Sequence, residues 1–190
     1  MLFRSYDPSL IDSYTDAEGT RTTQGELLGY LPQELSDEDK NKTVYQYFSE
    51  LQAFQTANPA DYYRISSELG FREEMFYSSQ AMSSLSGGER VKLQMAGILL
   101  AAPDILLLDE PTRGIDIGSK NEIYHEIITL AEQGKTIIMI SSELPEVLGI
   151  SDRIMVIHEG TVAAILDREE ATQEQILSYA AGLEQEIRSK

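Results

Sequence analysis

The chain has no cysteine among its 190 residues, which excludes disulfide bonds and metal sites built from thiolates. It also has no apolar run of the roughly 20 residues that a membrane-spanning helix needs. The longest candidate, residues 96–108, is interrupted by Pro103 and Asp104. Residues 1–7 contain no apolar core of signal-peptide length. We therefore expect the chain to stay in the cytoplasm and to reach a membrane only through a partner.

Positive charge is also scarce. Lys and Arg number 15 against 32 Asp and Glu, which gives a formal net charge of −17. An excess of this size repels a phosphate backbone, so we expect no direct contact with nucleic acid. Any bound nucleotide then needs local positive potential from a magnesium ion, a helix terminus or another chain. The hydrophobic content of 42% is sufficient for one domain with a core.

Residues 85–116 carry the clearest local pattern. The stretch opens with Leu-Ser-Gly-Gly-Glu-Arg, in which Ser86 and Glu89 form an S-x-x-E capping box, and apolar residues follow at helical spacing. The pattern predicts a helix that starts near Gly87. Free backbone N–H groups behind two glycines, together with the positive end of the helix dipole, favour a bound phosphate at this point.

A short apolar run follows this helix and ends in two acids. Pro103 closes the helix, and residues 105–108 have the composition of a strand buried on both faces. Asp109 and Glu110 stand at the carboxyl end of that strand, where open parallel sheets bind ligands. Such an acid pair can hold a magnesium ion and orient a water. On these residues alone, the alternative stays open that Ser86 is only a helix cap and that the two acids only begin a turn.

The two motifs in this order resemble the ATP-binding cassette (ABC) ATPases. The first resembles their signature motif, the second their Walker B strand with its catalytic glutamate, and residues 112–116 their D-loop. The resemblance implies ATP and Mg²⁺ as cofactors, with Asp109 on the magnesium, Glu110 polarising the attacking water and Asp116 signalling across a dimer. It also implies a signature that acts on the γ-phosphate of an ATP held by a partner cassette, through Leu85, Ser86, Gly87, Gly88 and Glu89.

Two further positions take their meaning from this resemblance. Gln33 lies just past a strand expected at residues 26–30, where ABC ATPases carry the Q-loop glutamine that reaches the magnesium and the attacking water; alone, it would be an exposed loop residue. Ser142 follows a strand expected at residues 136–140, where the family generally has a histidine that contacts the γ-phosphate. We count Ser142 among the nucleotide-binding candidates, with capping of the following helix as the alternative.

Helical and strand patterns alternate along the rest of the chain. Residues 2–25 have no sustained periodicity and are expected to be loop or irregular edge structure. The other patterns predict helices at residues 44–51, 60–69, 119–131, 144–148 and 172–182 and strands at residues 26–30, 105–108, 136–140, 153–158 and 161–167. This alternation predicts an α/β fold with a parallel sheet and crossover helices.

We therefore expect one incomplete ABC nucleotide-binding domain, a partial P-loop NTPase sheet with a helical subdomain inserted between Q-loop and signature. Its aromatic residues are expected to pack in the core of that subdomain. The expected parts are an N-terminal remnant, the helical subdomain, the signature with the Walker B strand, D-loop and C-terminal sheet, and a charged tail, at residues 1–32, 33–84, 85–182 and 183–190.

The sequence departs from a complete cassette at the phosphate loop. No G-x-x-x-x-G-K-[ST] motif occurs in the 190 residues. The Gly-Lys-Thr at residues 134–136 has Thr129 in place of the first glycine and precedes a strand, so we interpret it as a helix C-cap. Without the loop's lysine and backbone N–H groups, we expect the isolated chain to bind ATP poorly and to hydrolyse it negligibly. Loss of the strand before the loop also predicts an interior gap beside residues 105–108.

Two parts of the chain resemble different branches of the family. Residues 29–112 resemble the F subfamily of soluble ABC proteins that act on ribosomes, whereas residues 113–182 resemble, more specifically, the second cassette of monosaccharide-import ATPases. The leading hypothesis is an ABC ATPase domain or fragment coupled to solute import, with a monosaccharide as solute. A second ABC cassette would supply Walker A, and transmembrane permease subunits would be further partners. The alternatives are an F-subfamily-like protein on the ribosome, a non-catalytic interaction module, or a truncated product.

Overall fold

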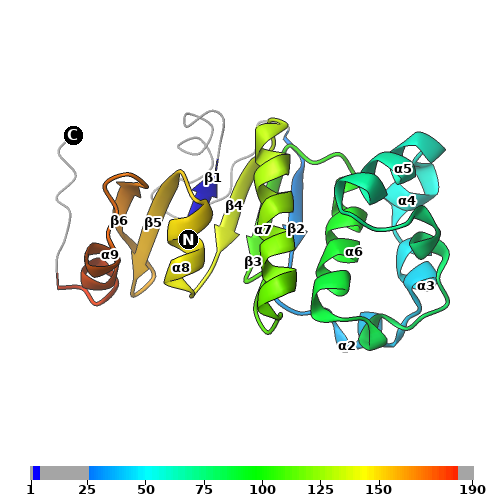
Figure 1. The fold of residues 1–190 in the computed structure, drawn as a ribbon, viewed down its shortest axis with the longest axis horizontal. Helices are drawn as coiled ribbons and strands as arrows, with labels where there is room; N and C mark the ends of the chain where they lie inside the picture. Colours follow the sequence, from blue (N-terminus) through cyan, green and yellow to red (C-terminus); the bar gives the residue numbers. More distant parts are fainter. Residues whose placement is uncertain (1, 5–25, 184–190) are drawn as a thin grey trace.

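The computed structural model describes residues 2–4 and 26–183, and their strands form one six-stranded sheet in the order β2-β3-β4-β1-β5-β6 (Figure 1). Strands β2, β3 and β4 are parallel, whereas β1 and the β5–β6 hairpin pair antiparallel. The predicted α/β class with a parallel sheet is confirmed. The strands are β1 Leu2–Arg4, β2 Leu28–Leu31, β3 Ile105–Asp109, β4 Thr136–Ile140, β5 Arg153–His158 and β6 Thr161–Asp167.

The helices follow the predicted periodicities closely where an apolar stripe is long. The capping box predicted at Ser86 with Glu89 is present, and Thr172 with Gln175 forms another. The described helices are α2 Asp37–Asn41, α3 Val44–Ser49, α4 Gln52–Thr56, α5 Pro59–Glu68, α6 Gly87–Leu99, α7 Ile117–Glu132, α8 Leu144–Ile150 and α9 Gln173–Ala180, with short 3₁₀ turns η1 Glu73–Tyr77 and η2 Met82–Ser84.

Strand β1 corrects the expectation that residues 2–25 begin as a loop. Its three residues lie between β4 and β5 and pair antiparallel with both, so that Leu2 faces Met139 on one side and Ile154 on the other. A three-residue strand is too short to show a period, and its hydrogen-bond partners lie more than a hundred positions away along the chain. Residues 5–25 and 184–190, which include most of the expected loop and tail, lie outside the described residues.

The expected interior gap beside residues 105–108 is also wrong for the described sheet. Strand β3 pairs directly with β4 along its whole length, from Ile105 opposite Thr136 to Asp109 opposite Ile140. Main-chain donors and acceptors on the facing sides of β3 and β4 are therefore paired with each other. The Gly-Lys-Thr sequence ends α7 as predicted, because Gly134 has a φ of 93° and Thr136 begins β4.

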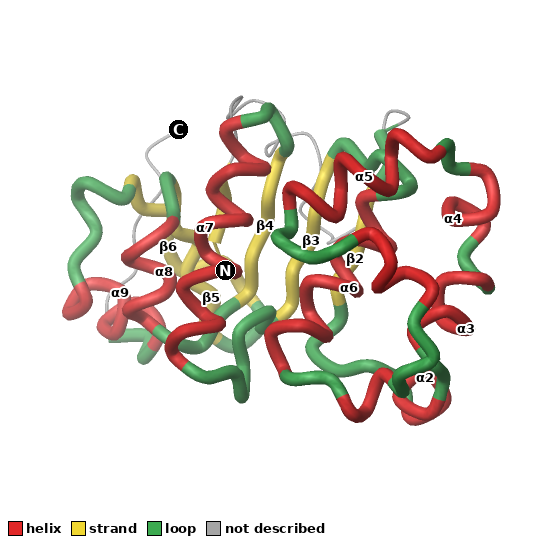
Figure 2. The backbone as a smooth tube through the Cα atoms, turned by 45° about the vertical axis from the view of Figure 1, so that its right-hand side comes forward, coloured by secondary structure: helices red, strands yellow, loops and turns green. Residues whose placement is uncertain are grey.

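Helices α2 to α5 lie beyond the β2 edge of the sheet, at the right of Figure 1 and again in Figure 2. Their predicted aromatic core is present, since Phe48, Phe54, Tyr62 and Phe76 are buried against one another. Three tyrosines of this part, Tyr45, Tyr63 and Tyr77, are exposed instead of buried, although the ring of Tyr77 still packs against Phe54 and Tyr62.

Helix α6 connects this helical part to the sheet. A Cβ on Gly29 of β2 would lie 2.2 Å from Ile98 Cγ2 of α6, so the helix touches the strand where only glycine leaves room. Both ends of the signature helix are thus fixed, one by its capping box and the other by the sheet.

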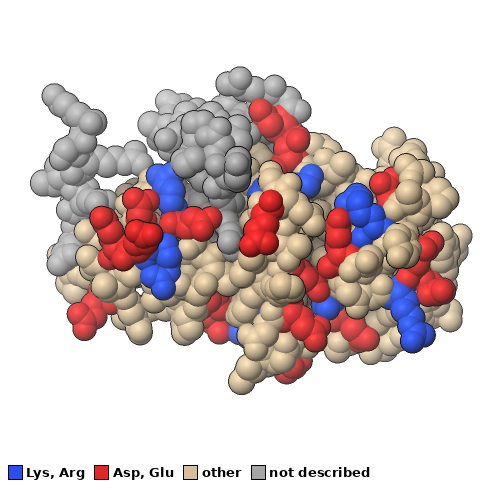
Figure 3. All heavy atoms as spheres, turned by 45° about the horizontal axis from the view of Figure 1, so that its top comes forward, with Lys and Arg blue, Asp and Glu red and all other residues tan. Residues whose placement is uncertain are grey.

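On the face seen in Figure 3, acidic side chains occur across the width of the molecule, and basic ones form separate small groups.

Candidate functional site

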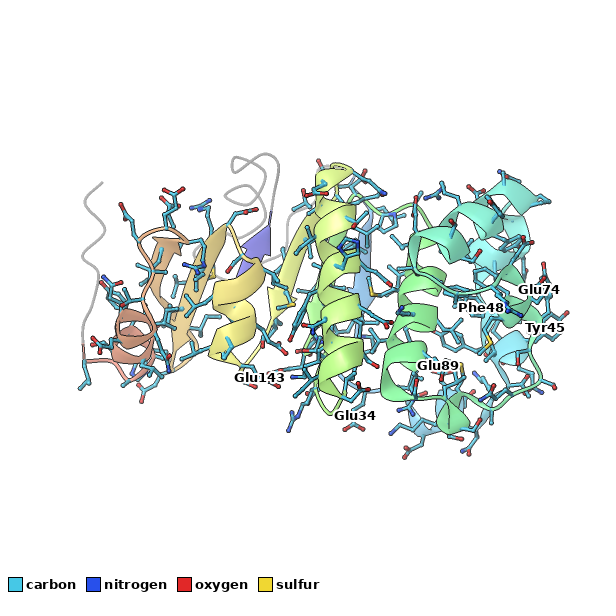
Figure 4. The ribbon with its side chains drawn as sticks, in the orientation of Figure 1. Glu34, Tyr45, Phe48, Glu74, Glu89 and Glu143 are labelled. Atoms are coloured by element: carbon cyan, nitrogen blue, oxygen red, sulfur yellow. The ribbon has the colours of Figure 1, made fainter. Side chains whose placement is uncertain are left out.

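The carboxyl ends of β2, β3 and β4 meet at one edge of the sheet, the lower edge in Figure 1. Their registers place Leu31 opposite Leu108 and Asp109 opposite Ile140. The segments that follow the strands therefore start side by side. Figure 4 labels Glu34 after β2 and Glu143 after β4 along this edge, and it also labels Glu89 at the start of α6, the helix that precedes β3.

Glu110 is held from two sides at this edge. Its backbone N–H donates to the Ile140 carbonyl at 2.9 Å, and its Oε1 accepts from the backbone N–H of Ser142 at 2.9 Å. Its φ of 46° lies in the left-handed region. The alternative that Ser142 caps the following helix is wrong. The N-cap residue of α8 is Glu143, and no side-chain hydrogen bond caps this helix start. Two predicted residues from separate strands are thus in direct contact.

Asp109 contacts a residue that the sequence did not single out. Its Oδ2 accepts from the Tyr30 hydroxyl at 3.3 Å, and partial burial together with the Asp109 charge raises the pKa of Tyr30. No group of three or more His, Asp or Glu side chains able to hold a metal occurs within residues 2–4 and 26–183. Magnesium commonly takes one or two protein carboxylates and completes its shell with phosphates and waters. Asp109 and Gln33 carry oxygens of the kind that such a ligand set uses, but Asp109 does not line the cleft that Gln33 lines.

A cleft of about 260 Å³ lies between the β2 loop, the start of α6 and the turn after β3. It brings together Gln33, Gly87 and Glu110, three predicted site residues from different parts of the chain. Two unpredicted residues also line it, Arg113 and the buried Gln94. The cleft is therefore lined by the predicted Q-loop glutamine, one glycine of the predicted signature and the candidate catalytic acid.

The signature residues are locked by their own capping box. The Glu89 carboxylate accepts from the Ser86 backbone N–H at 2.9 Å and from the Ser86 hydroxyl at 2.8 Å. These two bonds lower the pKa of Glu89. Leu85 is buried, and its carbonyl accepts from the Arg90 guanidinium at 3.0 Å. The donors at this helix start are therefore ordered around a negative charge.

The signature also packs against the start of α7. A Cβ on Gly88 would lie 2.8 Å from Ser119 Cβ, and one on Gly87 would lie 3.1 Å from Ile115 Cγ1. Asp116 caps α7, accepting from the Ser119 backbone N–H at 3.0 Å and from its hydroxyl at 2.7 Å. These bonds lower the pKa of Asp116. Ser119 thus connects Asp116, the last residue of the predicted D-loop, to Gly88 of the predicted signature.

The predicted residues do not all share one cavity. Ser86, Gly88 and Glu89 line a second, larger cavity of about 800 Å³ with Lys92 and Ser119, whereas Gly87 faces the smaller cleft. Asp109 and Asp116 line neither of these two. The candidate site is consequently divided by the first turn of α6.

The structure reveals a buried acid that the sequence analysis missed. Glu146 is 4% exposed and accepts hydrogen bonds from Tyr124 at 2.6 Å, from Ser141 at 2.7 Å and from Lys120 at 3.0 Å, and also from Thr112. Burial acts to raise its pKa, but these donors outweigh burial and lower it. Spacing was the available signal, because Glu146 falls on the same face of α8 as Val147 and Ile150, which are both buried.

Two features of the chain bear on nucleotide binding. The signature offers ordered donors, but the sequence has no phosphate-loop motif, and β3 and β4 pair with no strand between them. The residues present do not make a cradle for the β-phosphate.

No helix within the described part of the chain is long and apolar enough to cross a membrane.

Comparison with known proteins places these motifs in context. The chain is 46% identical over 165 residues to a putative ribose/galactose/methyl galactoside import ATP-binding protein of Geobacillus kaustophilus, covering 86% of this chain and 32% of that relative. It is 56% identical over 103 residues to the ribose import ATP-binding protein RbsA of Bacillus cereus, covering 54% of this chain and 21% of that relative. The chain thus spans a third or less of the length of these relatives.

Solved structures agree with the fold. A nucleotide-free ATP-binding cassette from an ABC transporter superposes with a TM-score of 0.65 at 18% identity, covering 86% of this chain and 71% of the other. An inward-facing putative metal-chelate type ABC transporter gives a TM-score of 0.66 at 18% identity, covering 92% of this chain and 72% of the other. The family model described as ABC transporter matches residues 9–113, more than half of the 190 residues. The chain belongs to the ABC transporter family.

Proposed function

We propose that this chain is the ATP-hydrolysing part of a sugar importer and that its signature acts on an ATP bound to a second cassette. The observation that carries the proposal is the meeting of Gln33, Gly87 and Glu110 around one cleft, with Glu110 held by Ser142. The solute is inferred from the relatives, whose names specify ribose, galactose and methyl galactoside import. Permease subunits in the membrane are the further partners that an import protein requires.

Glu110 is the proposed residue that polarises the attacking water. Ser142 occupies Oε1, so Oε2 is free to accept a hydrogen bond from a water in the cleft. Gln33 adds a neutral carboxamide that can orient the same water or a magnesium ion without adding charge. ATP, when bound, supplies the phosphoanhydride bond that is hydrolysed. Asp109 is the proposed carboxylate ligand of magnesium, and Asp116 the proposed signal across the dimer.

The proposed action in trans follows from the donors at the start of α6. Ser86 presents a backbone N–H and a hydroxyl, and both now bind the carboxylate of Glu89. A γ-phosphate from a partner would take over the same donors, with Gly87 and Gly88 allowing its close approach. Since this chain lacks a phosphate loop, the partner must hold the rest of the nucleotide.

The test is a mixture of this chain with an intact cassette whose own signature serine is replaced by arginine. ATP hydrolysis by the mixture then depends on the signature supplied here. Ser86→Arg should abolish that activity, whereas Ser83→Arg, which adds the same charge at an exposed position nearby, should leave most of it. Equal activity of the Ser86→Arg and unaltered chains would overturn the action in trans.

A second arm tests the hydrolytic role of Glu110. If Glu110 polarises water in this chain, Glu110→Gln should lower turnover of the mixture by about a hundredfold or more, because general-base catalysis contributes factors of this size. Binding of the two chains in the presence of ATP should persist. Unchanged turnover would assign hydrolysis to the partner's residues alone.

A further inference from the structure

We propose that Glu146 is a positioning residue for Glu110, because its carboxylate ties the turn that carries Glu110 to the loop that carries Ser142. Its hydrogen bonds go to the neighbours of these two residues, Thr112 and Ser141. The inference deepens the proposed function and rests on it only in taking Glu110 to act on water. No sequence motif assigned a role to Glu146.

The first contact of Glu146 is with the turn after β3. Thr112 lies two residues after Glu110, is 1% exposed, and donates its hydroxyl to Oε1 of Glu146. Within this turn the Arg113 backbone N–H donates to the Glu110 carbonyl at 3.1 Å, and the Ile115 backbone N–H donates to the Thr112 carbonyl at 3.3 Å. A hydrogen bond to an ionised carboxylate is roughly twice as strong as one between neutral groups, so the turn is anchored at this point.

The second contact is with the loop after β4. Ser141 donates its hydroxyl to Oε2 of Glu146 at 2.7 Å and accepts the backbone N–H of Glu143 at 3.0 Å. These two bonds hold the residues on either side of Ser142, whose own N–H donates to Glu110 at 2.9 Å. The two oxygens of one carboxylate therefore hold both sides of that contact.

Two further donors to Glu146 come from α7. Lys120 and Tyr124 donate to its Oε1 at 3.0 Å and 2.6 Å. The Lys120 backbone N–H donates to the Asp116 carbonyl at 2.9 Å, so this part of α7 begins directly at the predicted D-loop. A single carboxylate is therefore shared by three segments that carry predicted site residues.

Stability alone does not explain a charge in this place. Burial of a carboxylate is costly, and well-packed apolar residues in place of a buried ion pair often leave a protein equally stable. Burial acts to raise the pKa of Glu146, but its hydrogen bonds outweigh burial and lower the pKa, so the side chain is ionised at neutral pH. Four donors aimed at two oxygens allow a single arrangement of the segments that carry them. The charge therefore fixes geometry, which a water-polarising acid requires.

Hydrogen exchange of the Ser142 backbone N–H in the single chain measures its contact with Glu110. Glu110→Ala removes the acceptor and sets the exchange rate of the loop without the contact. Thr112→Val and Glu146→Gln leave both contact residues in place, and each should raise the rate about tenfold, toward the Glu110→Ala value. The N–H of Leu107 in β3, a strand paired on both sides, corrects for any loss of global stability.

Two control variants separate positioning from a general loss of stability. Thr112→Ser keeps the hydroxyl and should keep the exchange rate of the unaltered chain. Ser151→Ala removes a buried hydroxyl that donates to the Val147 carbonyl at the C-terminal end of α8, and it should not affect the Ser142 N–H. Unchanged exchange in both Thr112→Val and Glu146→Gln would overturn the proposal, and so would equal acceleration by Ser151→Ala.

Turnover by the mixture of this chain with the signature-deficient cassette tests the consequence for hydrolysis. Thr112→Val should lower kcat about tenfold and leave KM for ATP within about twofold, because a displaced acid slows the chemical step and leaves binding intact. Thr112→Ser should restore kcat. Full turnover by Thr112→Val, where Glu110→Gln is slow, would overturn the positioning role.

Failure of the proposed function is distinguishable from failure of this inference. Turnover that Glu110→Gln does not change would overturn the hydrolytic role of Glu110. The exchange rate of the Ser142 N–H is measured in the single chain without ATP, so it would still decide whether Glu146 positions Glu110.

Discussion

The backbone N–H of Ser142 donates to Oε1 of Glu110 over 2.9 Å, joining the residue after β3 to the loop after β4. Glu110 has a φ of 46°, in the left-handed region. A left-handed conformation costs a residue with a Cβ roughly 1–2 kcal/mol. The fold therefore keeps a strained backbone at the position where the candidate catalytic acid meets its neighbour.

Comparison of Glu110→Gly with Glu110→Ala should reveal this strain. Both variants lose the bond to Ser142, but only glycine adopts the left-handed conformation freely, so Glu110→Gly should be about 1 kcal/mol more stable in urea unfolding. Glu132 in α7 gives the matched control with the opposite sign. There the alanine variant should be more stable than the glycine variant by about 1 kcal/mol, because residue 132 is helical. The same order at both positions would contradict the strain.

Much of this edge follows from sequence patterns. The bounds predicted for β4, β5 and β6 match the structure, and the capping box at Ser86 predicts the start of α6. These signals are local, because the sequence pattern of a buried strand or a capped helix can be recognised within a few residues. The position of Glu110 at a strand end follows in the same way.

The parts that were missed depend on distant partners. Strand β1 has three residues and is defined by hydrogen bonds to β4 and β5. The direct pairing of β3 with β4 is likewise a choice of partner that no local pattern encodes. Gln33 and Glu110 likewise come to line one cleft only because the loop after β2 and the start of α6 lie beside the turn after β3.

Glu146→Gln should destabilise the chain by about 3 kcal/mol at neutral pH, as expected when a buried, hydrogen-bonded charge is removed. Urea unfolding measures the loss. The control is Glu143→Gln, which removes the second partner of the same Lys120, at 2.6 Å, from a side chain that is 49% exposed. Exposed pairs contribute about 0–1 kcal/mol, so this variant should stay close to the unaltered chain. Equal losses of stability in the two variants would mean that the buried carboxylate of Glu146 contributes no more than the exposed one of Glu143.

Acid should remove the stabilisation that Glu146 provides. Its pKa in the folded chain lies below the ordinary 4.5, so the unfolded chain binds the proton first as pH falls. Its stabilisation is therefore complete above pH 4.5 and is lost as pH falls through the lowered pKa. The difference in unfolding free energy between the unaltered chain and Glu146→Gln should shrink over this range. A constant difference would contradict the lowered pKa.

Glu126 should show the opposite pH dependence. It is 7% exposed, its Oε2 has no hydrogen-bond partner among residues 2–4 and 26–183, and burial raises its pKa although Lys92 lies 3.0 Å away. Because the folded pKa exceeds the ordinary 4.5, ionisation of Glu126 reduces stability as pH rises through the raised pKa. Glu126→Gln should thus cost less than about 1 kcal/mol at neutral pH.

Relative to this variant, the unaltered chain should gain stability as pH falls toward 4.5. Glu122→Gln is the control, because Glu122 pairs with the same Lys92 at 2.9 Å from a side chain that is 65% exposed. That variant should lack the pH-dependent difference. A loss of about 3 kcal/mol for Glu126→Gln would mean instead that its pair with Lys92 outweighs burial.

Gly88→Ala should separate α6 from α7. The new Cβ would lie 2.8 Å from Ser119 Cβ and 3.0 Å from Ser119 Oγ, so one helix must shift, at a cost of about 1–3 kcal/mol in urea unfolding. Gly149→Ala in α8 is the control, because a Cβ there meets nothing within 4 Å and should stabilise the chain slightly. Removing the opposing Cβ in the double variant Gly88→Ala, Ser119→Gly should recover part of the loss. Without such recovery, the strain would have to arise within α6, and the contact between the signature and α7 would not explain why glycine occupies position 88.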